Sequence, residues 1–178
     1  MKNIEDLNIK KEFQINPDLV FNLIVRSYSK PLYYSIKRIV ITHSDTDDIL
    51  QDTLVKVWHN LEKFNGESKI YTWIYKIAIN ESLMFLRSKK RKSWLLFDNS
   101  YESSARDNFT EINGDQINKK LQQALFTLPP KQKIIFNMRY FDELSFKEIA
   151  GILKLNEGGI KAQYHHARKK IESFINQD

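Results

Sequence analysis

The sequence predicts an all-α fold in which a flexible linker joins two small helical domains, and three observations support this. Apolar residues recur every three or four positions along most of the 178-residue chain, and no stretch shows convincing strand alternation. Glycine and proline are scarce, and the four prolines stand where a helix is expected to begin or stop. One long polar segment then interrupts the helical pattern and divides the chain in two.

Composition points to a polyanionic partner and a reducing compartment. The formal net charge of +6 suits nucleic acid or an anionic membrane surface, although a plain basic surface explains it equally well. Cysteine is absent, which excludes disulfides and thiolate metal sites. The first residues lack the apolar core of a signal peptide, and no apolar run reaches the roughly 20 residues of a membrane span. We therefore expect a cytoplasmic protein without stable membrane insertion.

Capping signals place the helices of the N-terminal half. Asn16-Pro17 begins DLVFNLIVRSY, Pro31 begins LYYSIKRIVI, and Ser44 with Asp47 forms a capping-box-like start for DDILQDTLVKVWHNLEKF. A loop over residues 64–70 precedes a long helix from about residue 71 to 90.

The polar segment DNSYESSARDNFTEINGD carries five acids against one arginine and lacks helical periodicity. It predicts a flexible linker over residues 96–115 between domains 1–95 and 116–178, with a long surface loop as the alternative.

The C-terminal half predicts a helix-turn-helix. Ser145 and Glu148 form a capping box for FKEIAGIL, and Asn156 caps a second helix that begins at Glu157. Ala150, Leu155 and Ile160 are five residues apart, as the motif requires. On the second helix, an apolar stripe lies opposite a basic face. The stripe is Ile160, Tyr164, Ala167, Ile171 and Phe174, and the other face holds Gly158, Lys161, Ala162, His165, Arg168 and Lys169. This face suits the DNA major groove, whereas a plain helical hairpin is the alternative.

The neighbours His165 and His166 point about 100° apart on a helix, so we expect no metal site there.

A second candidate surface combines rings and cations within SKIYTWIYKIAINESLMFLRSKKRK. Its predicted outward stripe is Lys69, Thr72, Trp73, Lys76, Asn80 and Arg87. Cations meet phosphates and rings stack on bases, so this mixture suits single-stranded nucleic acid, although aromatics at helical spacing are also common in a hydrophobic core. Glu81 falls within the apolar arc, and the sequence does not explain it.

An acidic helix lies upstream. Leu50, Leu54, Val57 and Trp58 form its predicted apolar stripe, while Asp48, Gln51, Asp52, Val55 and His59 form the other side. The helix dipole accounts for acids in the first turn, but an acidic face also suits a basic protein partner.

These segments together resemble the extracytoplasmic-function (ECF) sigma factors of bacteria, compact two-domain members of the sigma-70 family. DDILQDTLVKVW followed by FNGESKIYTWIYKIAINESLMFLRSKKRK is similar to their region 2. LPPKQKIIFNMRYFDELSFKEIAGILKLNEGGIKAQYHHARKKI is similar to their region 4. The resemblance covers most of the chain outside the first residues and the linker.

The resemblance implies a promoter-specificity subunit of RNA polymerase without catalysis of its own or a cofactor. Region 2 is expected to bind the clamp helices of the β′ subunit through Asp48, Gln51, Asp52 and Val55. It is also expected to open the −10 element with Phe64, Asn65, Ser68, Lys69, Tyr71, Trp73, Lys76, Asn80 and Arg87, and to hold a flipped base between the loop and Asn80. Region 4 is expected to read the −35 element through Lys161, Ala162, His165, His166 and Arg168. The β subunit and an anti-sigma factor are further implied partners.

Four positions depart from the family pattern and bear on which promoter is read. Met84 stands for a usual Asp, Lys154 for a frequent Gly, Gly159 for a frequent Thr, and Gln163 for a frequent Arg. The competing class is a conventional regulator that binds its operator alone as a dimer. An enzyme is disfavoured because the sequence has neither a glycine-rich phosphate loop nor a nucleophile elbow.

Overall fold

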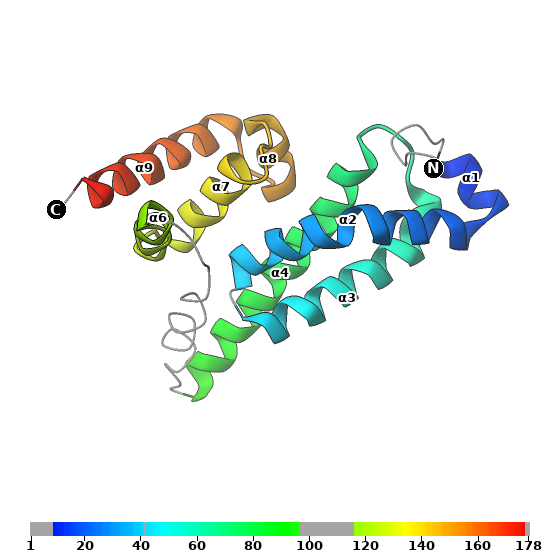
Figure 1. The fold of residues 1–178 in the computed structure, drawn as a ribbon, viewed down its shortest axis with the longest axis horizontal. Coiled ribbons are helices and arrows are strands. Elements are labelled where there is room, and N and C mark those ends of the chain that lie inside the picture. Colours follow the sequence, from blue (N-terminus) through cyan, green and yellow to red (C-terminus); the bar gives the residue numbers. More distant parts are fainter. Residues whose placement is uncertain (1–8, 41, 97–115, 177–178) are drawn as a thin grey trace. The chain divides into compact units, whose positions relative to one another are not determined.

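The computed structural model describes residues 9–40, 42–96 and 116–176, and every regular element within these ranges is helical. The chain divides into two compact units, Met1–Asp98 and Asn99–Asp178 (Figure 1). The predicted all-α fold class is confirmed. The linker predicted over residues 96–115 lies outside the described residues except for Leu96, which ends a helix.

Three long helices build the first unit. They are α2 (Pro17–Val40), α3 (His43–Asn60) and α4 (Ile70–Leu96), and each contacts the other two (Figure 1). The short α1 (Ile9–Ile15) packs on α2, and the 3-10 helix η2 (Leu61–Lys63) follows α3. Burying a large apolar side chain stabilises a fold by roughly 1.5–3 kcal/mol. The hydrophobic core supplies many of these: Val20, Ile24, Leu32, Ile36, Val40, Val57, Leu61, Ile74, Tyr75, Ala78 and Ile79.

One continuous helix, α2, replaces the two helices that the sequence predicted, so the prediction that Pro31 begins a helix is wrong. Pro31 lies inside α2, and its carbonyl accepts a hydrogen bond from the Ser35 hydroxyl at 3.0 Å. An interior proline costs roughly 3 kcal/mol. The buried face nevertheless continues across it, because Tyr28, Leu32 and Ile36 follow one another at intervals of four residues. Burial on both sides of the proline offsets the lost backbone hydrogen bond.

The start of α3 also differs from the prediction, which paired Ser44 with Asp47. Thr42 is the N-cap, and its side-chain oxygen accepts a hydrogen bond from the backbone N–H of Asp45 at 3.3 Å. The predicted pair has the correct three-residue spacing, but the observed pair, Thr42 and Asp45, lies two residues earlier in the sequence. Thr42 satisfies a backbone donor that the first turn of a helix leaves without an intrahelical partner.

The second unit is organised by its last helix. It comprises α6 (Gln116–Phe126), α7 (Pro130–Tyr140), α8 (Phe146–Leu153) and α9 (Glu157–Ile175), and α9 contacts the other three. One buried cluster combines residues of α6, α7 and α9 with Leu128 of the α6–α7 connection: Ala124, Leu125, Leu128, Phe136, Ala167 and Ile171. The face of α9 that the sequence predicted as apolar thus packs within the unit.

The predicted helix-turn-helix forms from α8 and α9. Ser145 and Glu148 make both halves of the capping box. Lys154 ends α8 with φ 53°, in the left-handed region where glycine is usual, so this lysine adopts a strained backbone at the position where the family frequently has glycine. Asn156 then caps α9, accepting a hydrogen bond from the Gly159 N–H at 2.6 Å.

Within the described ranges, none of the helices has the length and apolar character needed to span a membrane.

Candidate nucleic-acid and polymerase interfaces

The buried face of α3 carries threonines where the sequence suggested leucines. Thr46 and Thr53 are fully buried, together with Ile49 and Val57. The Thr46 hydroxyl donates to the Thr42 carbonyl at 2.6 Å, and the Thr53 hydroxyl donates to the Ile49 carbonyl at 2.7 Å. Since these hydroxyls find acceptors in their own helix, they lie in the hydrophobic core without an unpaired donor.

This arrangement turns three residues of the predicted apolar stripe outward. Leu50, Leu54 and Trp58 are half-buried and line an open groove of 590 Å³, whereas only Val57 of the stripe lies in the hydrophobic core. Trp58 is held edge-to-face by Phe21 of α2, with ring centroids 5.1 Å apart. The groove therefore has a firm aromatic wall and an apolar surface that the first unit leaves uncovered.

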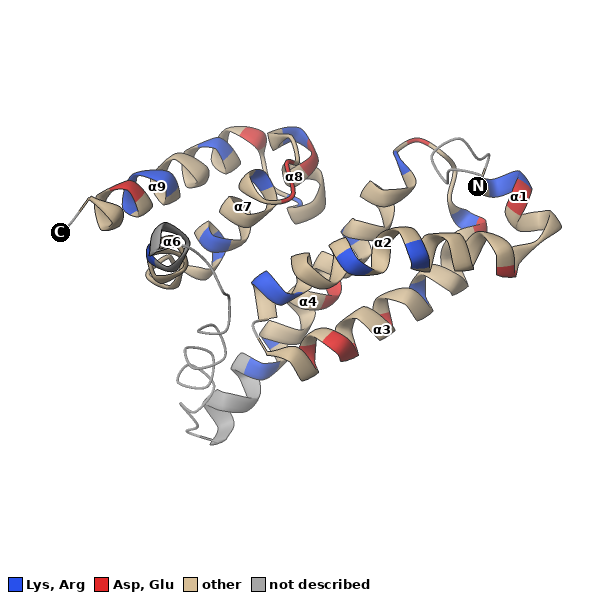
Figure 2. Cartoon of the chain, in the orientation of Figure 1, with Lys and Arg blue, Asp and Glu red and all other residues tan. Residues whose placement is uncertain are grey.

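Polar residues rim the groove. Its full lining is Phe21, Asp47, Leu50, Gln51, Leu54, Val55, Trp58 and His59. The four residues expected to bind the polymerase, Asp48, Gln51, Asp52 and Val55, are all exposed, and Val55 has 48% of its surface accessible. Figure 2 shows the acidic positions of α3 in red toward the start of the helix. Exposed acids beside an apolar groove suit a helical partner with both apolar and basic side chains.

The cationic and aromatic stripe of α4 faces away from the hydrophobic core. Trp73, Lys76, Asn80 and Arg87 follow one another at spacings of three, four and seven residues, so they share one side of the helix. Lys76 and Arg87 are exposed, while Trp73 and Asn80 are half-buried. Two cations, a partly open ring and an amide can together contact phosphates and unpaired bases.

The loop before α4 divides its predicted site residues into two groups. Asn65, Ser68 and Lys69 are exposed, and Gly66 makes the turn with φ 78°. Phe64 has only 6% of its surface accessible, and its ring lies against Trp73 with centroids 5.6 Å apart. Phe64 therefore supports Trp73 from within the unit rather than offering a free face to a base.

Aromatic packing also limits Tyr71. This half-buried ring lies 5.2 Å from Tyr28 and 5.9 Å from Tyr75, and Tyr75 is fully buried. A cluster of three tyrosines thus fixes the first turn of α4. Only part of the Tyr71 ring remains available to a ligand.

Glu81, which the sequence left unexplained, forms an ion pair with Lys56 of α3. The Nζ–Oε2 distance is 2.5 Å, and the Glu81 side chain is 16% accessible. The pair joins α3 to α4 beside the buried Ala78, Ile79 and Ser82. An acid in an apolar arc signals a partner on a neighbouring helix, but periodicity along one helix does not identify that partner.

The outward face of α9 carries the residues predicted to read DNA. Lys161, Ala162, His165, His166 and Arg168 are all exposed, whereas Ile160 and Ala167 are buried on the opposite side. Within the unit these five side chains therefore meet the first requirement for a recognition helix, which is access to the groove.

Two cations of this face already have acidic neighbours. Lys161 Nζ lies 2.7 Å from Glu157 Oε1, and Arg168 Nε donates to Glu172 Oε1 at 2.6 Å. The hydrogen bond with Glu172 raises the pKa of Arg168 above its ordinary value. Glu157 and Glu172 orient these side chains, and any anionic ligand of these cations must compete with them. Figure 2 shows the basic positions of α9 in blue, with an acidic position in red on either side of them along the helix.

Comparisons with known proteins agree with this architecture. The model of Sigma-70 region 2 matches residues 24–92, and that of Sigma-70, region 4 matches residues 118–171, so together they cover well over half of the chain. The chain is 24% identical to the ECF RNA polymerase sigma-E factor of Haemophilus influenzae, over 98% of this chain and 97% of the relative. It is 25% identical to the sigma-E factor of Escherichia coli K12, over 98% of this chain and 96% of the relative.

Solved structures share the fold. The sigma factor RpoE of Bartonella quintana, in complex with the anti-sigma factor NepR, superposes with a TM-score of 0.69 at 21% identity, over 89% of this chain and 98% of that one. CnrH, in complex with the cytosolic domain of CnrY, superposes with a TM-score of 0.68 at 18% identity, over 96% of both chains. The matches to both sigma-70 regions and to full-length relatives establish that the chain belongs to the sigma-70 family, as an ECF RNA polymerase sigma factor.

Proposed function

We propose that this sigma factor docks on core RNA polymerase through the groove of α3. The observation that carries the proposal is the uncovered apolar lining of Leu50, Leu54 and Trp58 beside exposed acids. Apolar side chains at the centre of an interface give affinity when they are desolvated, and charged residues at its rim steer association. A helix with apolar and basic side chains complements this surface, as the resemblance implies for the β′ clamp helices.

The test is competition for core polymerase. We expect the double change Asp48→Lys and Asp52→Lys to weaken binding at least tenfold, because it reverses two exposed charges of α3 that are close in sequence to the groove residues Gln51 and Val55. Glu62→Lys is the control for reversing an exposed acid, since Glu62 lies in η2 and not in α3. Equal affinity of the double variant and the control would refute the docking site.

The stripe of α4 is proposed to melt and hold the −10 element. Lys76 and Arg87 contact the backbone, Trp73 stacks on an unpaired base, and Asn80 contacts the edge of a base held against the loop at Asn65. Stacking on an aromatic side chain contributes about 1–3 kcal/mol per base. Trp73→Ala with Asn80→Ala is expected to slow promoter opening more than initial binding. A permanganate footprint identical to that of the unchanged protein would reject this role.

The helix α9 is proposed to enter the major groove of the −35 element. Lys161, Ala162, His165, His166 and Arg168 are the proposed contacts, supported by their common exposure. We expect Lys161→Glu to abolish transcription from a promoter that depends on this element. Retained transcription there would remove Lys161 from the contact set.

Further proposals concern organisation, partners and catalysis. We assign core binding and melting to residues 1–95, a linker to 96–115 and −35 recognition to 116–178. The factor acts on polymerase in the cytoplasm, has no catalytic activity of its own, and is held inactive by an anti-sigma factor that covers the groove of α3. In vitro transcription with core polymerase and a promoter library tests whether the chain directs promoter-specific initiation. A dimer that binds an operator without polymerase would instead indicate a conventional regulator.

A further inference from the structure

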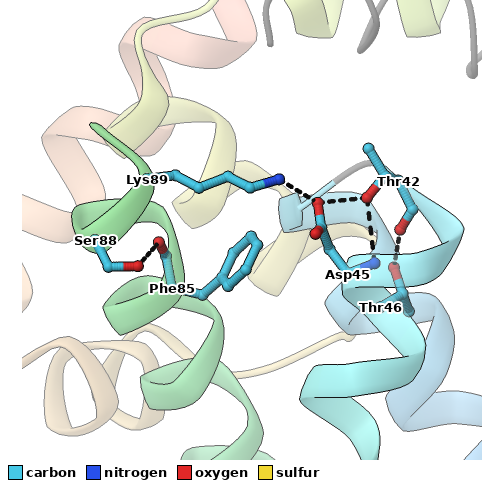
Figure 3. Close-up of polar contacts among 6 residues, drawn as sticks. All are labelled: Thr42, Asp45, Thr46, Phe85, Ser88 and Lys89. Atoms are coloured by element: carbon cyan, nitrogen blue, oxygen red, sulfur yellow. Dashed lines mark hydrogen bonds and ion pairs between the residues drawn. The ribbon is translucent and has the colours of Figure 1, made fainter. Parts of the chain in front are cut away.

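An ion pair ties the far half of α4 to the first turn of α3. Lys89 Nζ lies 2.7 Å from Asp45 Oδ2, although 44 residues separate them (Figure 3). The side chains of Asp45 and Lys89 are 16% and 35% accessible, so water and salt screen this pair less than a fully exposed one. The contact is therefore more consequential than an ordinary surface ion pair.

The acidic end of this pair is itself held in place. The Thr42 hydroxyl donates to Asp45 Oδ2, and the Asp45 N–H donates back to Thr42 Oγ1 (Figure 3). The Thr42 carbonyl also accepts the Thr46 hydroxyl. The carboxylate is thus built into the N-cap of α3, where the helix dipole favours a negative charge.

The basic end is also fixed. Lys89 Nζ lies 4.8 Å from the centroid of the Phe85 ring, a cation–π contact one turn back along α4. Figure 3 shows the lysine reaching from α4 across to Asp45, with the Phe85 ring beneath it. Both partners of the ion pair are therefore oriented by contacts within their own helices.

The position of the pair along α4 matters, because the fully buried side chains among those described in this helix lie in its first part. Ser82 is the last fully buried side chain among those described in α4. After it, Leu83, Phe85 and Leu86 are only half-buried. Arg87 belongs to this less buried part, so its placement relative to Trp73, Lys76 and Asn80 depends on how the far half of α4 is anchored.

We propose that Asp45 is a positioning residue for promoter DNA. Through Lys89 it anchors the far half of α4 and keeps Arg87 in line with the stripe, without touching DNA itself. This inference rests on the proposed role of α4 in melting. It separates Asp45 from the exposed Asp48 and Asp52, which belong to the proposed polymerase contacts on the same helix.

The proposal predicts the opposite effect of Asp45→Asn on the rate of promoter opening from the one that charge alone predicts. Asp45→Asn removes a negative charge from a DNA-binding unit, and if Lys89 contacted phosphate directly it would also release a competitor of DNA. Both effects would speed promoter opening. A positioning role predicts slower opening instead, because the far half of α4 loses its anchor.

The experiment uses holoenzyme on a promoter that it transcribes, with opening followed by permanganate reactivity and core binding measured separately. We expect Asp45→Asn and Lys89→Met each to slow opening three- to tenfold and to change core affinity less than twofold. The double variant should be no slower than either single one, because both remove the same bridge. Lys89→Arg, which keeps the charge, should retain most of the opening rate.

The Lys56–Glu81 pair supplies matched controls, since it also joins α3 to α4 but lies where the hydrophobic core anchors α4. Glu81→Gln and Lys56→Met remove the same kinds of charge and should change opening less than twofold. Unchanged or faster opening with Asp45→Asn overturns the proposal, and so does an equal loss in the control variants or in core affinity. If Trp73→Ala with Asn80→Ala leaves opening intact, the role of α4 in melting fails as well, which distinguishes the two failures.

Discussion

Lys133 of α7 carries a measurable cost of burial in the second unit. Burial lowers its pKa from 10.5 to about 8, and its ammonium lies 4.7 Å from the centroid of the Phe126 ring. The two pKa values differ by about 2.5, and each unit corresponds to about 1.4 kcal/mol, so the upper bound is about 3.5 kcal/mol. Because part of the side chain reaches solvent, we expect about 1–3 kcal/mol.

The sign of the pH dependence follows from these values. Below pH 8 the folded and unfolded chains both bind the proton, and the fold bears the full cost of the buried ammonium. Between about pH 8 and 10.5 only the unfolded chain binds it, so this contribution makes the fold more stable as pH rises. Lys133→Met removes the charge, and it should raise the free energy of unfolding by about 1–3 kcal/mol at pH 7. The gain should shrink toward pH 10.5.

The assay is urea unfolding of the full chain. The three tryptophans, Trp58, Trp73 and Trp94, all belong to the first unit, so their fluorescence follows its unfolding. Far-UV circular dichroism follows both units, and the change that fluorescence does not show reports on the second unit, which holds Lys133. The exposed Lys131 on the same helix gives a matched control, because Lys131→Met removes an equal charge at the surface. If Lys133→Met gains no more stability than Lys131→Met at pH 7, or if the gain persists undiminished at pH 10.5, the assigned cost of burial is wrong.

Further outcomes are expected at the start of α9 and on the buried face of α3. Asn156→Ala should lower the stability of the second unit by about 1 kcal/mol, measured by urea unfolding, because it removes the cap of α9. Gly158→Ala should raise the thermal unfolding temperature, because its Cβ meets Asn156 only at 3.7 Å and alanine favours a helix by roughly 1 kcal/mol. Gly159→Ala should gain less, since its Cβ would lie 3.0 Å from Asn156 Oδ1, and equal gains would contradict this geometry. Thr53→Val should change stability by less than about 1 kcal/mol, whereas Thr53→Lys should unfold the first unit by burying an ammonium; a stable, folded Thr53→Lys variant would show that the site is not buried.

Local chemistry made much of the second unit predictable. The Ser145–Glu148 capping box, the Asn156 cap and the stripe of Ile160, Ala167 and Ile171 depend on residues within a few turns of one another. A helix cap is a short-range hydrogen bond, and an apolar stripe is a fixed angular pattern, so both can be predicted from neighbours in the sequence. Outward positions such as Lys161 followed directly from the same pattern.

Features that depend on a partner in a distant segment could not be predicted from the sequence. Pro31 predicts a helix break until the buried face on both sides of it is known. The position of Glu81 in the apolar arc of α4 is explained only by its ion pair with Lys56 of α3. Phe64 belonged to the expected DNA contacts, but its burial against Trp73 depends on how the loop folds back on α4. A local sequence pattern, however clear, does not identify such tertiary contacts.

Which residues α3 buries and which it exposes also bears on function. A helix that served only its own fold would bury its largest apolar residues, yet α3 buries Thr46 and Thr53 and leaves Leu50 and Leu54 lining an open groove. Hydrogen bonds to backbone carbonyls make the threonines acceptable inside, so the leucines are not needed there. Apolar area left outside gains its stabilisation only when a partner covers it. The chain thus keeps on its surface the apolar side chains that the proposed docking of α3 on polymerase would cover.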